Sequence, residues 1–207
     1  MLDRYQVLSV LVTNTLLLVI LLNLILGLYY SVRLASGAAE HGETDTPDPI
    51  LKYGYETLQL AYPGWTEDDL SALLGEVWGR RFQCAPFVHF REIPVDGTYL
   101  HVDEAGFRWN AEAPPWPPVE DALTIFVFGG STTFGYGLPD YQTIPAAMQE
   151  ALQQTSEGQA IHVYNFGQGA YYSALEVTFF QELLRAGHVP DVVIFIDGLN
   201  DMGNRIE

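Results

Sequence analysis

The sequence predicts an α/β protein with a doubly wound parallel sheet, preceded by one transmembrane helix and a small α+β segment. Two observations predict the sheet: three short apolar runs follow residue 119, and amphipathic stretches with short connections separate them. A run of 24 uncharged residues near the N-terminus predicts the membrane helix. We therefore expect an anchor over 1–37, an acidic linker and small α+β segment over 38–118, and an α/β domain over 119–207.

The composition narrows the classes of function. Of 207 residues, 9 are Lys or Arg and 26 are Asp or Glu, which gives a net charge of −17. Such an acidic protein repels phosphate backbones, so we expect no nucleic-acid partner. Cys84 is the single cysteine, which excludes an intramolecular disulfide framework and a multi-cysteine metal site. We expect neither a cofactor nor a bound metal.

The uncharged run, Val7–Tyr30, is long enough to cross a bilayer as a helix. At ~1.5 Å per residue it spans ~36 Å, against a hydrocarbon core of ~30 Å. The alternative is a cleaved signal peptide, but the run exceeds the usual apolar length of about 7–15 residues. Arg4 and the terminal amine lie on one side, and Arg33 lies close on the other. The positive-inside rule therefore favours a cytoplasmic N-terminus and an extracytoplasmic, periplasmic bulk.

One stripe of this helix is suited to packing against another transmembrane helix in the bilayer. Small and polar residues recur on it at intervals of three and four, although Asn14 lies on the opposite side. Chance is the alternative explanation for this spacing. The stripe consists of Ser9, Thr13, Leu16, Ile20, Asn23 and Gly27.

The middle region begins with an acidic, turn-rich linker over Ala38–Pro63, whose carboxylates lack the spacing of a calcium loop. Thr66 is then placed to cap an amphipathic helix. Strands are expected over Phe87–Val95 and Thr98–Val102. The apolar positions of the helix are Leu70, Leu73, Leu74, Val77 and Trp78.

The last region alternates strand and helix. Parallel strands are buried on both faces and contain continuous apolar runs. We expect a first helix from the cap Thr143 to about Gln153. A second helix is expected from Ser173 to Ala186, opened by an S-x-x-E capping box. The three predicted strands are Leu123–Phe128, Ile161–Asn165 and Val192–Ile196.

Chemically active residues follow all three strands at the edge where open α/β sheets place their sites. A hydroxyl follows the first strand, a glycine-rich turn the second and a carboxamide the third. A nucleophile beside a backbone N–H and an amide side chain is suited to stabilising a tetrahedral oxyanion. The alternative for the first loop is a tight turn capped by Ser131. The three segments are 129–135, 165–169 and 197–201.

These segments resemble the SGNH (GDSL-like) hydrolases. F-G-G-S-T-T-F-G resembles the first family block and D-G-L-N-D the third. The resemblance implies Ser131 as nucleophile and Asn200 in the oxyanion hole, on a flavodoxin-like sheet. N-F-G-Q-G-A resembles the second block, which implies a backbone donor at Gly169 or Ala170. The segment T-Y-L-H-V-D-E-A-G-F-R resembles the one that precedes the hydrolase domain in membrane-attached members.

The D-x-x-H block that supplies the catalytic Asp and His in this family is absent from the 207 residues. His162 and His188 lie at the opposite ends of their strands from Ser131. No local pattern recommends the remaining histidines as a base: His41, His89 and His101. We therefore expect either the first part of a longer hydrolase or a form that has lost its base.

Two hypotheses follow. One is a membrane-anchored SGNH-type hydrolase that is catalytically incomplete as given and acts on a small ester or acylated substrate. The other is a non-catalytic, single-pass subunit of a larger membrane complex that reuses this fold.

A double substitution tests whether the stripe binds a partner helix. Replacing Asn23 and Gly27 by Leu removes a carboxamide, whose interhelical hydrogen bond is worth ~0.6–2 kcal/mol, and a point of close backbone approach. We expect weaker co-purification of a membrane partner and unchanged insertion. Size-exclusion chromatography after detergent extraction measures this. If wild type and variant both elute as the same monomer, the stripe has no partner.

Overall fold

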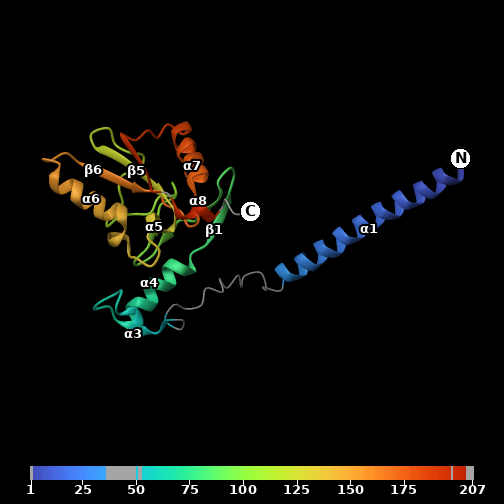
Figure 1. Cartoon of the computed structure of the whole chain (residues 1–207), viewed down its shortest axis with the longest axis horizontal. Coiled ribbons are helices and arrows are strands. Elements are labelled where there is room, and N and C mark those ends of the chain that lie inside the picture. Colours follow the sequence, from blue (N-terminus) through green and yellow to red (C-terminus); the bar gives the residue numbers. More distant parts are fainter. Residues whose placement is uncertain (1, 36–49, 51–52, 197, 204–207) are drawn as a thin grey trace. The chain divides into compact units, whose positions relative to one another are not determined.

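The computed structural model describes residues 2–35, 50, 53–196 and 198–203 (Figure 1). The chain forms two compact units, Met1–Thr46 and Pro47–Glu207. Of the predicted linker over Ala38–Pro63, residues 38–49, 51 and 52 lie outside the described residues, and its last part contains a short helix over Tyr55–Leu58 where only turns were expected.

The first unit contains helix α1 (Leu2–Ala35). Its segment Tyr5–Tyr29 has a mean hydropathy of 2.4 over its most apolar window and is long and apolar enough to cross a membrane. Asn23 Nδ2 donates a hydrogen bond to the Val19 carbonyl at 2.8 Å, within the same helix. The predicted helix is therefore present, and its length and composition fit a membrane span.

The second unit is built on a three-stranded parallel sheet. The central strand is β5 (Leu123–Gly129), which pairs with β6 (Ile161–Asn165) on one side and β7 (Val192–Ile196) on the other. Ile125 of the central strand lies opposite residues 163 and 192. The three predicted strands are confirmed, with β5 one residue longer than expected.

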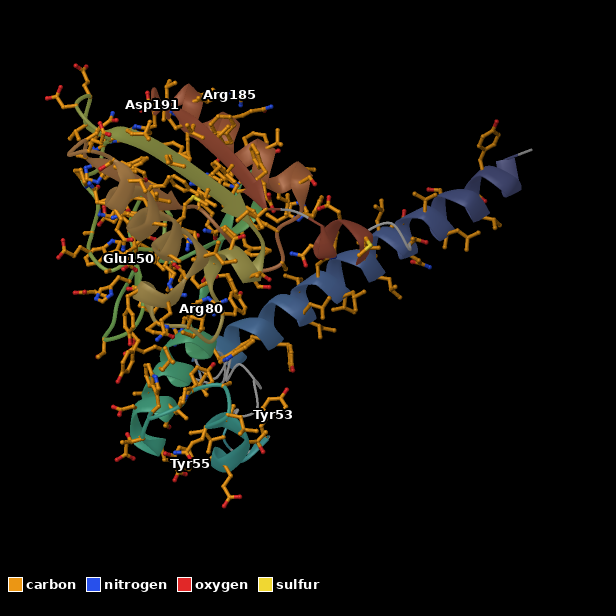
Figure 2. All side chains as sticks on the ribbon, turned by 60° about the vertical axis from the view of Figure 1, so that its left-hand side comes forward. Tyr53, Tyr55, Arg80, Glu150, Arg185 and Asp191 are labelled. Carbon is orange, nitrogen blue, oxygen red and sulfur yellow. The ribbon has the colours of Figure 1, made fainter. Side chains whose placement is uncertain are left out.

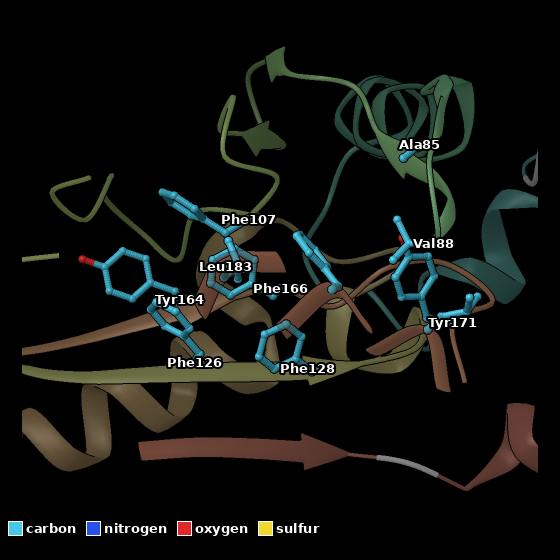
Figure 3. Close-up of a cluster of buried hydrophobic side chains, with 11 residues drawn as sticks. Ala85, Val88, Phe107, Phe126, Phe128, Tyr164, Phe166, Tyr171 and Leu183 are labelled. Carbon is cyan, nitrogen blue, oxygen red and sulfur yellow. The ribbon is translucent and has the colours of Figure 1, made fainter. Parts of the chain in front are cut away.

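Helices cover both faces of this sheet, as expected for a doubly wound arrangement. Helix α7 (Ser173–Arg185) packs on the aromatic face formed by Phe126 and Phe128 (Figure 3). Helix α6 (Ile144–Thr155) packs on the face that carries Ile125 and Val127. Because successive side chains of a strand point to opposite faces, the continuous apolar run of β5 serves both layers.

The helix caps agree with the sequence in one case and differ in the other. Thr143 Oγ1 accepts a hydrogen bond from the Ala146 N–H at 3.2 Å, so the predicted cap of α6 is confirmed. The predicted capping box of α7 is wrong, because Tyr172 occupies the cap position and makes no side-chain cap hydrogen bond. Gly187 follows the helix with φ 90°, a conformation that favours glycine.

Before the sheet, helix α3 (Tyr55–Leu58) is followed by α4 (Glu67–Gly79). Thr66 caps α4, as predicted, by accepting from the Asp69 N–H at 3.1 Å. Four of its five predicted apolar residues are buried, and Trp78 is 36% exposed. The buried ones are Leu70, Leu73, Leu74 and Val77.

The two strands predicted in this region are wrong in their extent. The structure has two hairpins instead, each made of two short antiparallel strands. Phe87 and His89 both have φ 67°, in the left-handed region that ends an extended run, so a turn interrupts the predicted strand. The four strands are β1 (Phe82–Ala85), β2 (His89–Glu92), β3 (Val95–Asp96) and β4 (His101–Val102).

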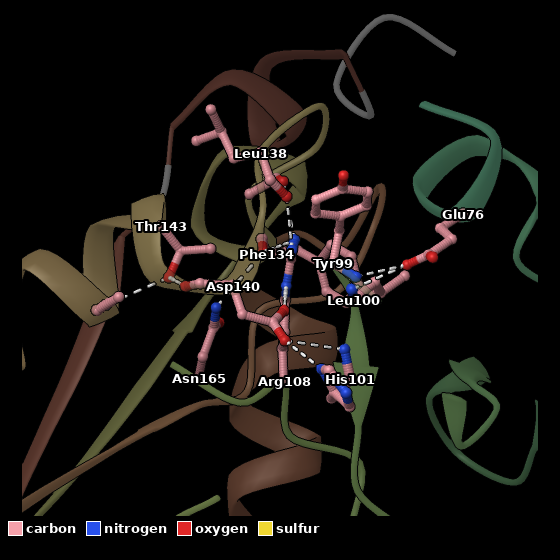
Figure 4. A network of polar contacts seen from close by, with 12 residues as sticks. Glu76, Tyr99, Leu100, His101, Arg108, Phe134, Leu138, Asp140, Thr143 and Asn165 are labelled. Atoms are coloured by element: carbon pink, nitrogen blue, oxygen red, sulfur yellow. Dashed lines mark hydrogen bonds and ion pairs between the residues drawn. The ribbon is translucent and has the colours of Figure 1, made fainter. Parts of the chain in front are cut away.

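A buried arginine joins the second hairpin, β3–β4, to the sheet (Figure 4). The Arg108 backbone N–H donates to the Asn165 carbonyl of β6 at 2.8 Å, and Arg108 also bridges to Val102 of β4. Its side chain is fully buried and pairs with Asp140 at 2.7 Å. The guanidinium also donates to the carbonyls of Phe134, Gly135 and Leu138. One side chain therefore fixes the loop that follows β5.

Replacing Arg108 by Met tests this role. The change leaves Asp140 as a buried carboxylate without its main partner, and we expect a loss of about 3–5 kcal/mol in the free energy of unfolding. Arg185→Met is the matched control, because Arg185 lies exposed at the end of α7 (Figure 2) and should change stability by less than about 0.5 kcal/mol. Urea unfolding measures both. Equal midpoints for the two variants would contradict the prediction.

Candidate active site

A cavity of about 200 Å³ lies where the three strands end. β5 leads into α5 (Ser131–Phe134), and β7 leads into α8 (Leu199–Gly203). The lining includes backbone from the β5 and β7 ends and side chains from α7 and α8. The lining residues are Gly130, Ser131, Thr132, Tyr171, Glu176, Ile196, Gly198, Asn200 and Asp201.

Ser131 is the first residue of α5 and lines the cavity. Its carbonyl accepts hydrogen bonds from the N–H groups of Gly135, at 3.0 Å, and Tyr136, at 3.1 Å. Gly135 closes this turn with φ 91°, and a Cβ there would collide with Thr143. The sharp turn after β5 therefore depends on glycine, and it holds the Ser131 backbone at the mouth of the cavity.

Asn200 enters the same cavity from α8. Its Nδ2 donates to the Tyr171 carbonyl at 2.6 Å. A carboxamide –NH2 carries two hydrogens, and an oxyanion donor at this position would use one of them. A Cβ on Gly130 would collide with Asn200 Nδ2, so the glycine before Ser131 permits this close approach. The structure thus brings together Ser131 and Asn200.

Gly169 and Ala170 are not among the described lining residues of the cavity. Ala170 has φ 59° and is exposed, whereas Gly169 packs so closely on Tyr136 that a Cβ would collide with its hydroxyl. Burial raises the pKa of Glu92, and Arg80 and the Gly169 backbone both oppose that rise. The Gly169 backbone therefore faces the buried carboxyl group of Glu92.

Tyr171 follows these two residues and connects the cavity to the first hairpin. Its hydroxyl donates to the Phe90 carbonyl, and the two rings pack edge to face at 5.5 Å. Burial raises the pKa of Tyr171, so the hydroxyl keeps its proton. Nothing in the local sequence pattern distinguishes Tyr171 from a core aromatic residue, so its place in the cavity was not predicted.

Two carboxylates of the lining, Glu176 and Asp201, were also not identified as site residues. Glu176 is 1% exposed. Its sequence pattern, S-x-x-E, predicted a capping role for it instead. Asp201 ends the D-G-L-N-D segment and accepts hydrogen bonds from Ser173. Its position next to Asn200 in the sequence was the one signal that could have predicted it at the site.

Among the described residues, no histidine lines the cavity. His101 is held by Asp140 at 2.7 Å and stacks on Trp109 at 4.6 Å. His188 packs on Trp116 and lines a separate hollow with Asp191, before the start of β7. His41 lies outside the described residues. The described part of the chain also has no group of three or more His, Cys, Asp or Glu residues placed to hold a metal ion.

No family model and no curated protein matches the chain. Among solved structures, it is similar to AlinE4, an SGNH-hydrolase family esterase, with 26% sequence identity and a TM-score of 0.37. The match covers 43% of this chain and 47% of the esterase. Two mutants of that esterase match over the same shares, at 26% identity with a TM-score of 0.37 and at 24% with 0.35. The chain thus spans less than half the length of the esterase.

Gly130→Ala tests the close packing of Asn200 on the β5 loop. The added methyl group would occupy the place of Asn200 Nδ2, so we expect the carboxamide to move. The side-chain NH2 resonances of Asn200, assigned by their loss in Asn200→Ala, should shift in a ¹⁵N spectrum.

Gly75→Ala is the matched control. Gly75 lies within α4, and a Cβ there meets nothing within 4 Å. This change should leave the Asn200 resonances in place and stabilise α4 by up to about 1 kcal/mol. Unmoved resonances in Gly130→Ala would show that the observed packing is not maintained in solution.

Proposed function

We propose that the chain carries the nucleophile and oxyanion side of a membrane-anchored SGNH-type hydrolase that cleaves a small ester or transfers its acyl group. The observation that carries this proposal is the meeting of Ser131 and Asn200 in one cavity at the carboxyl edge of a parallel sheet. Open α/β sheets bind their ligands at this edge.

In this proposal, Ser131 Oγ attacks the ester carbonyl and the alcohol leaves, which gives an acyl-serine that water then hydrolyses. Asn200 Nδ2 and a backbone N–H near Gly169 or Ala170 stabilise the tetrahedral oxyanion. A general base must remove the Ser131 proton. The sequence contains no D-x-x-H segment, so no residue is assigned to this role here.

Helix α1 supplies the anchor in this proposal, because Tyr5–Tyr29 is long and apolar enough to span a bilayer. The N-terminus is then cytoplasmic and the sheet-containing unit periplasmic, following the distribution of Arg4 and Arg33. A helix partner in the membrane would contact Ser9, Thr13, Asn23 and Gly27.

A second function is favoured by one specific observation. No described histidine lines the cavity, and His101 is bound to Asp140 and stacked on Trp109. This arrangement supports a non-catalytic, single-pass subunit of a membrane complex, in which the same cavity binds a ligand but does not cleave it.

Ester turnover separates the two functions. A triad enzyme without its base retains roughly 10³–10⁴-fold acceleration over water, from its oxyanion hole and substrate binding. We expect p-nitrophenyl acetate turnover by the purified chain to be this weak. Added imidazole, acting as a general base, should increase it in wild type. Ser131→Ala gives the reaction of imidazole alone, which is subtracted.

Asn200→Ala should reduce the Ser131-dependent kcat by about 10²–10³-fold with little change in KM. An effect on KM alone, or none, would make Asn200 a turn residue and favour the non-catalytic subunit. Strong turnover without imidazole that Ser131→Ala abolishes would show instead that the chain already holds a base.

A further inference from the structure

Ser173, in the first turn of α7, forms side-chain and backbone hydrogen bonds with α8. Ser173 Oγ donates to Asp201 Oδ1 at 2.6 Å, and the Ser173 backbone N–H donates to the two carboxylate oxygens at 3.2 and 3.4 Å. Asp201 therefore accepts both donors of one residue. Ser173, the first residue of α7, thus pairs with a carboxylate, as in a capping box. The carboxylate is that of Asp201 in α8, not one within α7.

This contact lies one residue from Asn200. Asn200 and Asp201 are consecutive in α8, and they bond to Tyr171 and Ser173, which are two residues apart. Two neighbouring side chains of α8 thus form hydrogen bonds just before and at the start of α7, Asn200 with the Tyr171 carbonyl and Asp201 with Ser173. This double attachment fixes both the position and the rotation of α8.

Helix α8 needs such an attachment. It has only five residues, and an isolated helix of that length is not stable in water. It follows Gly198, whose φ of 141° lies in the range that L side chains rarely adopt. Glycine has the widest backbone freedom, so Gly198 itself does little to fix the position of α8. Tertiary contacts, not helix propensity, must therefore hold α8 in place.

We infer that Asp201 is a positioning residue that sets the Asn200 carboxamide against Ser131 by anchoring α8 to Ser173. This inference rests on the proposed role of Asn200 as an oxyanion donor. Such a donor works only when it lies about 2.7–3.1 Å from the developing oxyanion, so a small displacement of α8 is costly. Asp201 does not touch the reacting atoms in this assignment.

Three variants of the full chain, reconstituted in nanodiscs, separate positioning from folding. Asp201→Ala removes the anchor, Asp201→Asn keeps an oxygen that accepts from Ser173, and Ser173→Ala removes the 2.6 Å bond from the other side. In the imidazole-assisted ester assay, we expect Asp201→Ala to lower kcat about 10–100-fold with KM little changed. Asp201→Asn should recover most of this loss.

A double mutant tests whether Asp201 acts through Asn200. In the Asn200→Ala background, Asp201→Ala should cause no further loss of kcat, since the group that it positions is gone. Losses that multiply would overturn the inference. Glu150→Ala, on the exposed face of α6 (Figure 2), is the control for removing a carboxylate and should leave kcat unchanged.

A spectroscopic measurement keeps the inference testable when turnover is absent. The Asn200 side-chain NH2 resonances should shift in Asp201→Ala and Ser173→Ala, and stay closer to wild type in Asp201→Asn. Unmoved resonances in a folded Asp201→Ala or Ser173→Ala chain would overturn the inference. Shifted resonances without any Ser131-dependent turnover would support the positioning role and reject the hydrolase proposal.

Discussion

The buried Arg108 guanidinium is the contact on which the arrangement of the second unit depends. The backbone of Arg108 extends the sheet beside β6, and its side chain binds Asp140 and three carbonyls of the loop after β5. Burying a guanidinium is costly unless its donors find partners. Here carbonyls and one carboxylate supply them, so the loop must adopt the single shape that places those oxygens around Arg108.

A second buried pair repeats this arrangement nearer to the second strand end. Arg80 donates to Glu92 at 2.8 Å, and its guanidinium lies 3.8 Å from the centroid of the Tyr136 ring. The Glu92 backbone N–H in turn donates to Gln168, in the loop after β6. Buried polar contacts from the segment before the sheet therefore reach two loops near the candidate site, the one after β5 through Arg108 and the one after β6 through Glu92.

The sequence predicted the sheet well because continuous apolar runs have few alternatives when they alternate with amphipathic stretches. It failed for the hairpins, where non-glycine residues such as Phe87 adopt positive φ that no local pattern announces. Ser131 and Asn200 were expected to lie at one sheet edge because both follow strands, and both line the same cavity. Glu176 and Asp201 were missed as site residues. A capping box has the same local pattern whether its carboxylate bonds within the helix or lines a cavity, and tertiary contacts decide between the two.

The position of β7 has a consequence for the order in which this unit opens. Among the described strands, β5 is bonded on both sides, whereas β7 is bonded on one side and its side chains are partly exposed. A strand that is paired on one side opens more readily than a strand that is paired on both sides, so within the described residues β7 opens more readily than β5. Such an opening would leave α8 dependent on its bonds to Tyr171 and Ser173, while the central strand stays intact. The two halves of the candidate site thus follow strands of different connectivity: Ser131 follows β5, which is paired on both sides, and Asn200 follows β7, which is paired on one side among the described strands.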